Sequence, residues 1–274
     1  MSDDAQFQVQ EVSPSYWQVT FTNGEVNLYD VDSVEQLADL VTRIEQAEDL
    51  TVVVFRSGNP DFFMAHWDML SDQARVAAMR PGPTGLHPYA DNLVRLSRVP
   101  AVTVTAIDGR ARGAGSEFVL ATDIRFAGPG AVLGQFEVGV GSVPGGNPMG
   151  RLARLVGRGR AMEIMLGADD FPAGLAAAYG YVNRVLPAGE LDGFVDAFAR
   201  RVAGFDKVAV AEAKALLDAS VPVPDEESAA SLATFFRTSG RPENADRVRR
   251  LFDRGLQRPD GAEIDLGRQV AEPA

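Results

Sequence analysis

Two glutamates, Glu117 and Glu137, are the residues of this sequence best suited to acid–base chemistry. Glu117 follows the glycine-rich stretch Gly113–Ser116 at the start of a predicted short helix, and Glu137 lies 20 positions further on, between further glycines. Both stand among apolar residues, where an isolated carboxylate is costly to keep ionised. Two such groups beside flexible glycine segments indicate an acid–base pair that flanks a substrate.

Two junctions that follow predicted strands carry candidate hydrogen-bond donors. The first N–H groups of a helix have no partner inside that helix, and the small side chains of Gly113 and Ala114 leave them open to a ligand oxygen. A second candidate donor lies in Asp61–Asp68, after the predicted strand Thr51–Phe55. Two N–H groups aimed at one oxygen would form an oxyanion hole.

Several other chemistries are excluded or disfavoured. The sequence has no cysteine, which rules out disulfides, thiolate nucleophiles and cysteine-bound zinc. It contains no serine-hydrolase elbow, no phosphate-binding loop and no complete dinucleotide-binding fingerprint. Because there are only two histidines, His66 and His87, we expect no metal site.

Composition places the chain among ordinary globular proteins. Its 274 residues are 46% hydrophobic and 23% charged, and its formal net charge is −12. The negative charge argues against nucleic acid or an anionic membrane as the main partner. No signal peptide and no apolar run long enough to span a membrane is recognisable, so we predict a cytoplasmic protein.

Predicted strands and helices alternate in the first half of the chain, which indicates β-α-β crossovers and a mainly parallel sheet. A predicted helix begins at Ser33, with Gln36 completing a capping box. We interpret Ser71–Pro88 as a mobile excursion and a candidate lid. The predicted strands are Tyr16–Phe21, Thr51–Phe55, Val102–Ile107 and Asp123–Phe126.

From Gly146 onward the pattern is almost entirely helical, apart from Tyr181–Val185. We therefore divide the chain into a core, residues 1–205, and a helical C-terminal region, residues 206–274, with a loose polar tail from Arg258. The predicted helices are Leu191–Val202, Val208–Ala219, Glu226–Phe236 and Pro242–Leu256.

Four segments in order resemble the crotonase (enoyl-CoA hydratase/isomerase) superfamily, and the likeness covers about Gln18 to Phe205. One segment alone is weak, whereas four in order at suitable spacing are specific. They are Phe63–Asp68, against the family's Phe-x-Ala-Gly-x-Asp; Gly113–Glu117, against a glycine-rich start that ends in Glu; Ala131–Gly146, which contains Glu137; and Leu152–Glu163.

The resemblance implies an α/β fold, a crotonase-like spiral of β-β-α repeats, followed by a helical C-terminal region that trimerises into a homotrimer or a dimer of trimers. It implies an acyl-CoA thioester substrate, a place in fatty acid metabolism and no permanently bound cofactor. The thioester oxygen would lie between the N–H groups of Ala65 and Ala114. Glu117 and Glu137 match the glutamates that add water across the 2,3-double bond in hydratases, with syn geometry.

The chain departs from the family pattern at several positions. His66 stands in place of a glycine, either as a further acid–base or substrate-binding group, or as a side chain that only caps a turn or points to solvent. Trp67 is a wall of the acyl pocket or plain packing, and Asp68 is a loop or helix cap rather than a catalyst. We count both, with His66 and Gly113, among the candidate substrate-binding residues. Ala114 replaces a glycine at the second donor, and Phe136 replaces a proline.

The region expected to meet the coenzyme A phosphates also differs. Asn23–Leu28, which includes Glu25, replaces an Arg-Pro-rich turn, so Arg56, Arg75 or Arg80 would have to supply the phosphate contacts. Two alternatives to hydration stay open. The same fold could house an isomerase, a decarboxylase or a C–C hydrolase, with His66 and Trp67 reshaping the pocket, or a catalytically silent binding subunit.

Overall fold

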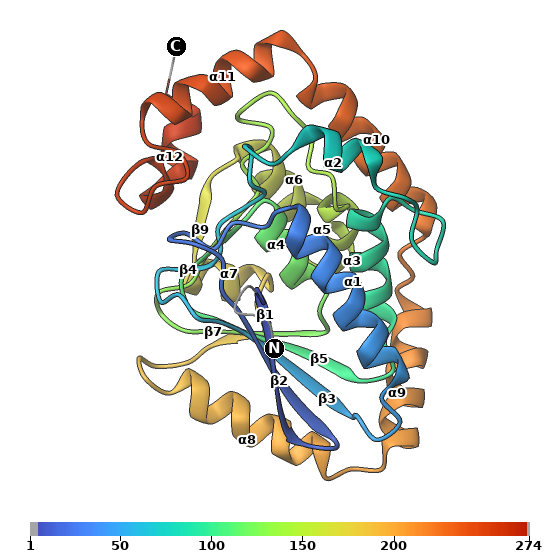
Figure 1. Ribbon diagram of the computed structural model, residues 1–274. Coiled ribbons are helices and arrows are strands. Elements are labelled where there is room, and N and C mark those ends of the chain that lie inside the picture. The colour runs from blue at the N-terminus through green and yellow to red at the C-terminus, as the bar shows by residue number, and fades with distance from the viewer. Residues whose placement is uncertain (1–4, 273–274) are drawn as a thin grey trace.

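A computed structural model describes residues 5–272 and contains two sheets (Figure 1). The larger sheet is parallel except for β1, which pairs antiparallel with β2. Its strands, in spatial order, are β1 (Phe7–Ser13), β2 (Tyr16–Phe21), β3 (Val52–Ser57), β5 (Val102–Ile107), β7 (Ile124–Ala127) and β10 (Arg184–Val185). The smaller sheet, whose last strand is antiparallel, contains β4 (Phe62–Met64), β6 (Arg110–Arg112), β8 (Val132–Gly134) and β9 (Asp170–Pro172).

The chain alternates between the two sheets. Strands β3, β5 and β7 of the larger sheet lead into β4, β6 and β8 of the smaller one, and helices follow each pair. This is the spiral of β-β-α repeats that the resemblance implied. The helices of this part are α1 (Val31–Gln46), α2 (Gln73–Ala78), α3 (Pro88–Arg98), α4 (Ala114–Leu120), α5 (Pro148–Val156), α6 (Arg158–Gly167) and α7 (Ala173–Tyr179).

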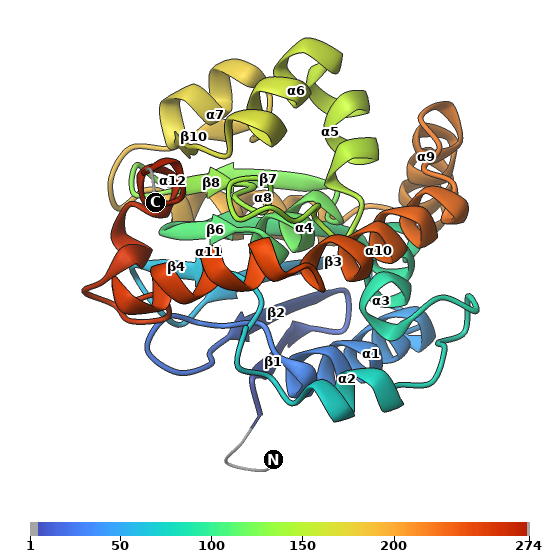
Figure 2. The same cartoon turned by 90° about the horizontal axis from the view of Figure 1, so that it is seen from above.

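The C-terminal part is helical, as predicted. In Figure 1, α10 and α11 lie at the end of the molecule opposite α8, and Figure 2 shows them running across the face that carries α4 and β4. The remaining elements are α8 (Leu191–Ala203), α9 (Lys207–Ser220), α10 (Asp225–Ser239), α11 (Pro242–Asp253), a 3₁₀ turn η1 (Ala262–Ile264) and α12 (Leu266–Ala271). Within residues 5–272, none of the helices combines the length and apolar character needed to cross a membrane.

Strand β3 shows why its sequence is continuously apolar. Val53 and Phe55 face the main core, whereas Val52 and Val54 face a second apolar layer built with α8. Because both faces of the strand are covered, alternation with polar residues disappears. The prediction of a strand buried on both faces is confirmed.

Helix α1 begins at Val31, two residues before the predicted start. Asp30 is the N-cap, and its side chain accepts from the Ser33 amide (2.8 Å) while the Ser33 hydroxyl accepts from the Asp30 amide (3.1 Å). The capping box is therefore formed by Asp30 and Ser33 rather than by Ser33 and Gln36. Serine replaces the usual glutamate or glutamine at the third position, which concealed the true start.

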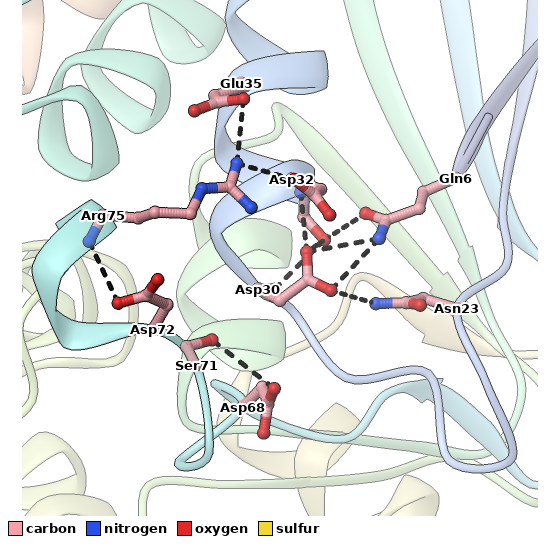
Figure 3. Close-up of polar contacts among 10 residues, drawn as sticks. Gln6, Asn23, Asp30, Asp32, Glu35, Asp68, Ser71, Asp72 and Arg75 are labelled. Atoms are coloured by element: carbon pink, nitrogen blue, oxygen red, sulfur yellow. Dashed lines mark hydrogen bonds and ion pairs between the residues drawn. The ribbon is translucent and has the colours of Figure 1, made fainter. Parts of the chain in front are cut away.

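The predicted excursion Ser71–Pro88 has two parts. Helix α2 buries none of its residues, and Arg75 joins it to Asp32 (2.7 Å) and Glu35 (3.1 Å) of α1 (Figure 3). The second part is tied to α3, because the amide and hydroxyl of Thr84 both donate to the buried Asp91 carboxylate (2.8 and 2.7 Å).

The segment from Arg258 to Glu272 is not the loose tail that we predicted. It buries Ala262, Leu266 and Val270, and the last two pack in one apolar cluster with Phe136 and Val140. Gly267 permits close packing, since a Cβ there would lie 2.5 Å from the Asp170 amide nitrogen. The few apolar residues stand too far apart in a polar sequence to show a helical period, so the pattern hid this packing.

Candidate active site

A cavity of about 400 Å³ brings together most of the predicted site residues. The β4 loop contributes to one side, α3, α4 and the loop after β8 to others, and α10 and α11 supply an apolar wall that includes Leu232, Phe235 and Val248. The predicted residues that line it are His66, Trp67, Ala114, Glu117 and Glu137. Ala65, Asp68 and Gly113 do not line it.

Two glycines leave space for the two carboxylates. A Cβ at Gly113 would lie 2.6 Å from Glu137 Oε1, and a Cβ at Gly146 would collide with Glu117 Oε2. Gly113 also has φ of +47° at the N-cap of α4, a conformation that side chains disfavour. The glycine-rich sequence around Glu117 therefore serves both the backbone and the carboxylates.

Both glutamates are buried, and their hydrogen bonding is incomplete. Glu117 Oε2 accepts from the Tyr89 hydroxyl. Within the described part of the chain, Glu117 Oε1 and Glu137 Oε2 have no hydrogen-bond partner. Buried polar atoms are normally paired, so two open carboxylate oxygens at one cavity indicate a place where a ligand or a water binds.

The surroundings of the two carboxyl groups shift their pKa values to different extents. Burial raises the pKa of Glu117, while the Tyr89 hydroxyl and the nearby Gly146 amide act to lower it. Burial, and then the charge of Glu117, raises the pKa of Glu137 well above its ordinary range. The surroundings therefore oppose ionisation of Glu137 more than that of Glu117.

Of the two backbone donors that we predicted, the Ala114 amide is available and the Ala65 amide is not. The Ala65 N–H donates to the Asn27 carbonyl (3.0 Å), so it is already engaged inside the protein. Two residues further on, the Trp67 N–H has no acceptor among residues 5–272, and neither has the Ala114 N–H. The amides of Trp67 and Ala114 are therefore the available donors. The prediction for Ala65 was wrong, because its amide serves the internal structure of the protein.

Trp67 and Asp68 have distinct surroundings. The Trp67 ring packs edge-on against Tyr89, with ring centres 5.8 Å apart, and also lines the cavity. Asp68 Oδ1 accepts from the Leu70 amide (2.9 Å) and from Gln257 Nε2 (2.6 Å). Asp68 therefore caps the loop, which is one of the two structural roles predicted for it.

His66 does not point to solvent. Its side chain is 1% exposed, Nε2 lies 2.7 Å from Glu263 Oε1, and Nδ1 lies 2.7 Å from the Trp67 carbonyl oxygen. Burial acts to lower the pKa of His66, but the charge and hydrogen bond of Glu263 raise it overall. Burial acts to raise the pKa of Glu263, and the charge of His66 lowers it overall. The two groups form a buried ion pair.

Sequence reasoning missed Tyr89, Glu263 and the apolar wall from the C-terminal helices. Tyr89 lies 28 positions before Glu117, and Glu263 lies 197 positions after His66, so no local spacing connects either pair. The wall residues show only the ordinary apolar pattern of amphipathic helices.

The arginines proposed as phosphate ligands are occupied or lie away from the cavity. Arg56 pairs with Asp192, and Arg75 pairs with Asp32 and Glu35. Neither these two arginines nor Arg80 line the cavity. In the part of the chain that the structure describes, no cluster of three or more His, Asp or Glu side chains is placed to hold a metal ion.

Comparisons with known proteins identify the family of the chain. Residues 11–246 match the family described as enoyl-CoA hydratase/isomerase. A Mycobacterium avium protein named as a probable enoyl-CoA hydratase, echA17, is 31% identical over 184 residues, which cover 67% of this chain and 70% of that protein. The short-chain-enoyl-CoA hydratase of Clostridium acetobutylicum is 28% identical over 187 residues, covering 68% of this chain and 70% of its own.

Solved structures give the same result for the fold. A candidate enoyl-CoA hydratase from Streptomyces avermitilis is 37% identical, covers 98% of this chain and 97% of its own, and superposes with a TM-score of 0.92. Pseudomonas aeruginosa DspI is 27% identical with a TM-score of 0.72, covering 92% of this chain and 91% of its own. By its family match, its relatives and its fold, this chain belongs to the enoyl-CoA hydratase/isomerase family of the crotonase superfamily.

Proposed function

We propose that this protein catalyses the reversible syn addition of water to the 2,3-double bond of an acyl-CoA thioester. One observation carries the proposal: two buried carboxylates with open oxygens and two unengaged backbone amides contribute to a single cavity. The hydratases among the curated relatives support the same substrate class. The reaction needs no permanently bound cofactor.

In this proposal, the N–H groups of Trp67 and Ala114 hold the thioester oxygen. Attack by water at the β-carbon moves an electron pair from the double bond onto that oxygen, which makes an enolate. Each backbone donor aimed at such a developing charge contributes a few kcal/mol in the transition state, by the usual order of magnitude. Ala114 keeps the N–H that a glycine would supply, and adds only a methyl group.

The carboxyl groups divide the proton transfers. Glu117, which retains charge beside Tyr89, takes a proton from the water as its oxygen bonds to the β-carbon. Glu137, which stays protonated, gives its proton to the α-carbon of the enolate. In the first step a water O–H bond and the 2,3 π bond break, while the β-carbon–oxygen bond and the Glu117 O–H bond form. In the second step the Glu137 O–H bond breaks and a C–H bond forms at the α-carbon. Proton exchange between the carboxyl groups through solvent or product restores the starting state.

Two further features belong to the proposal. The apolar wall formed by Leu232, Phe235 and Val248 receives the acyl chain. We also propose a homotrimer or a dimer of trimers, because apolar side chains on α6, including Met162 and Leu166, are exposed in the single chain. Light scattering against the chain mass of 29.3 kDa measures this directly.

The test is hydration of crotonyl-CoA and longer 2-enoyl-CoAs, followed as loss of the conjugated enoyl absorbance. We expect turnover by the wild type, and a fall in kcat of about 10²- to 10⁴-fold in Glu117→Gln and in Glu137→Gln. Glu212→Gln, which changes an exposed carboxylate on α9, is the control and should leave the rate unchanged.

The same assay separates the alternatives. An isomerase would instead convert 3-enoyl-CoA into the conjugated 2-enoyl form and would retain activity in one of the two glutamine variants. A silent binding subunit would bind the thioester without turnover. Hydration at the wild-type rate in both glutamine variants would contradict the assigned roles.

A further inference from the structure

We propose that the C-terminal segment Gln257–Glu263 positions the Trp67 N–H donor, and that Glu263 and Gln257 are its positioning residues. Glu263 acts through His66, and Gln257 acts through Asp68 and Met69. The inference rests on the proposed function, in which the Trp67 N–H holds the thioester oxygen. It assigns a role to a segment that the reaction chemistry itself does not use.

The segment holds the donor loop on both sides of Trp67. Before Trp67, His66 Nε2 is bonded to Glu263 Oε1 at 2.7 Å. After Trp67, Gln257 Nε2 donates to Asp68 Oδ1 at 2.6 Å, and Gln257 Oε1 accepts from the Met69 amide at 3.2 Å. Three side-chain bonds from one short segment therefore flank the Trp67 peptide unit.

A separate contact sets the direction of the N–H group. The Trp67 N–H and the His66 carbonyl belong to one peptide unit. That carbonyl accepts a hydrogen bond from the Tyr29 amide at 2.8 Å. Because a peptide unit is planar, that bond fixes the plane in which the Trp67 N–H lies. The His66 ring, bonded at one nitrogen to the Trp67 carbonyl and at the other to Glu263, fixes the loop relative to the rest of the protein.

The segment is itself anchored against movement. Glu263 Oε1 also accepts from the Gln257 amide (2.9 Å), which closes the loop between the two positioning residues. The Glu263 main-chain carbonyl accepts from Arg112 Nη1 (2.8 Å), and the Arg112 guanidinium makes two bonds to Asp170 (2.6 and 2.7 Å). Behind the segment, Leu266 and Val270 pack in the cluster that contains Phe136 and Val140.

Charge balance explains why the acid is needed here. The buried groups that face His66 are Glu263 on η1 and Arg112 on β6, and the Arg112 charge is compensated by Asp170. Without a negative charge at position 263, the His66 cation would stand uncompensated near Arg112, and His66 would lose its proton. A buried histidine at position 66, where the family has glycine, therefore depends on Glu263 of the C-terminal segment.

The test uses the full-length protein and a chromophoric substrate analogue, 4-(dimethylamino)cinnamoyl-CoA. The absorption of this conjugated thioester moves to longer wavelength when hydrogen-bond donors polarise its carbonyl. The variants are Glu263→Gln, which keeps the side-chain shape and removes the charge, and Gln257→Gly, which removes both loop contacts. Glycine is chosen because Gln257 has φ of +65°, a conformation that glycine adopts easily. Asp260→Asn, an exposed acid between the two positions, is the matched control.

We expect the wild type and Asp260→Asn to give the same red shift. Glu263→Gln and Gln257→Gly should bind the analogue with a smaller shift, and kcat for hydration should fall about tenfold or more with KM little changed, because the lost alignment acts in the transition state. A purely structural role would lower the melting temperature without changing the shift of the folded fraction.

Two outcomes would overturn the inference in different ways. Wild-type shifts and rates in both folded variants would contradict the positioning role alone. The absence of any shift with the wild-type protein would contradict the oxyanion hole, and this proposal with it. Should Glu263→Gln fail to fold, Gln257→Gly decides, since it removes no buried charge.

Discussion

The surroundings of Glu137 oppose ionisation more strongly than those of Glu117, the other carboxyl group of the cavity. It is buried, it faces the charge of Glu117, and one of its oxygens has no partner among the described residues. Glu117 is equally enclosed but receives the Tyr89 hydroxyl. A single hydrogen-bonding tyrosine thus favours the charged form of Glu117 over that of Glu137.

Glu137→Gln should stabilise the protein at neutral pH while it slows hydration. The folded-state pKa of Glu137 is raised above its ordinary value of 4.5, so the folded protein binds this proton more tightly than the unfolded chain does. The stability of the wild type therefore falls as pH rises from 4.5 toward the raised pKa, and the variant lacks this loss. We expect the free energy of unfolding of Glu137→Gln to exceed that of the wild type by about 1 kcal/mol at pH 7, and by less near pH 4.5.

Urea unfolding at a series of pH values measures this gap between wild type and variant. Glu212→Gln provides the control, since its carboxylate is exposed. A gap that stays constant with pH, or that closes as pH rises, would contradict the proposed protonation state of Glu137.

At the residue scale, the sequence located the two candidate carboxylates better than the side chains that surround them. Glu117 and Glu137 stood out because glycines and apolar residues flank them, and both line one cavity. Tyr89 and Glu263 could not be predicted, because they meet their partners only through the folded chain. The motif around Phe63–Asp68 located the donor loop but not the amide, since only the Ala65–Asn27 hydrogen bond reveals which N–H is occupied.

The contact between α4 and β4 brings the two donor segments together. A Cβ at Gly115 would collide with the Met64 carbonyl oxygen, so the start of α4 lies directly against the end of β4. This close approach places the Ala114 amide beside the segment that leads to Trp67. The small residues at the start of α4 are therefore required by packing as well as by access to the donor.

Gly115→Ala should consequently harm both stability and activity. The added methyl group meets main-chain atoms that cannot rotate away, so we expect the free energy of unfolding to fall by about 1–3 kcal/mol. Gly193→Ala in α8, where a Cβ meets open space, is the control and should stabilise by about 0.4–1 kcal/mol. Urea denaturation measures both, and equal effects of the two substitutions would contradict the packing argument.

At the element scale, long elements were predictable and short ones were not. Strand β5 has the predicted bounds, and helices α8 to α11 lie close to theirs. Helices α8 and α11 carry a clear apolar period, and Pro222 and Pro224 mark the break between α9 and α10. The strands of the smaller sheet have only three residues each, too few to show any period. Helix α12 and η1 were missed because their burial depends on contacts with Phe136 and Asp170 rather than on local pattern.

The whole molecule folds its C-terminal region back over the site. Helices α10 and α11 contribute to the cavity wall, and the following segment holds the loop that carries Trp67. Figure 1 shows this region arching over the end of the molecule that contains α2 and α6. The region predicted as a helical appendage with a loose tail therefore contributes to the site, and the catalytic proposal depends on residues from both parts of the chain.

The central claim concerns one convergence: two amides and two carboxyl groups act on the same thioester. A crystal structure with bound octanoyl-CoA, a saturated thioester that cannot be hydrated, measures it directly. We predict the thioester oxygen at about 3 Å from the amide nitrogens of both Trp67 and Ala114, with Glu117 and Glu137 facing its α- and β-carbons. A thioester oxygen bound away from these amides, with either carboxyl group turned from the acyl chain, would contradict the account.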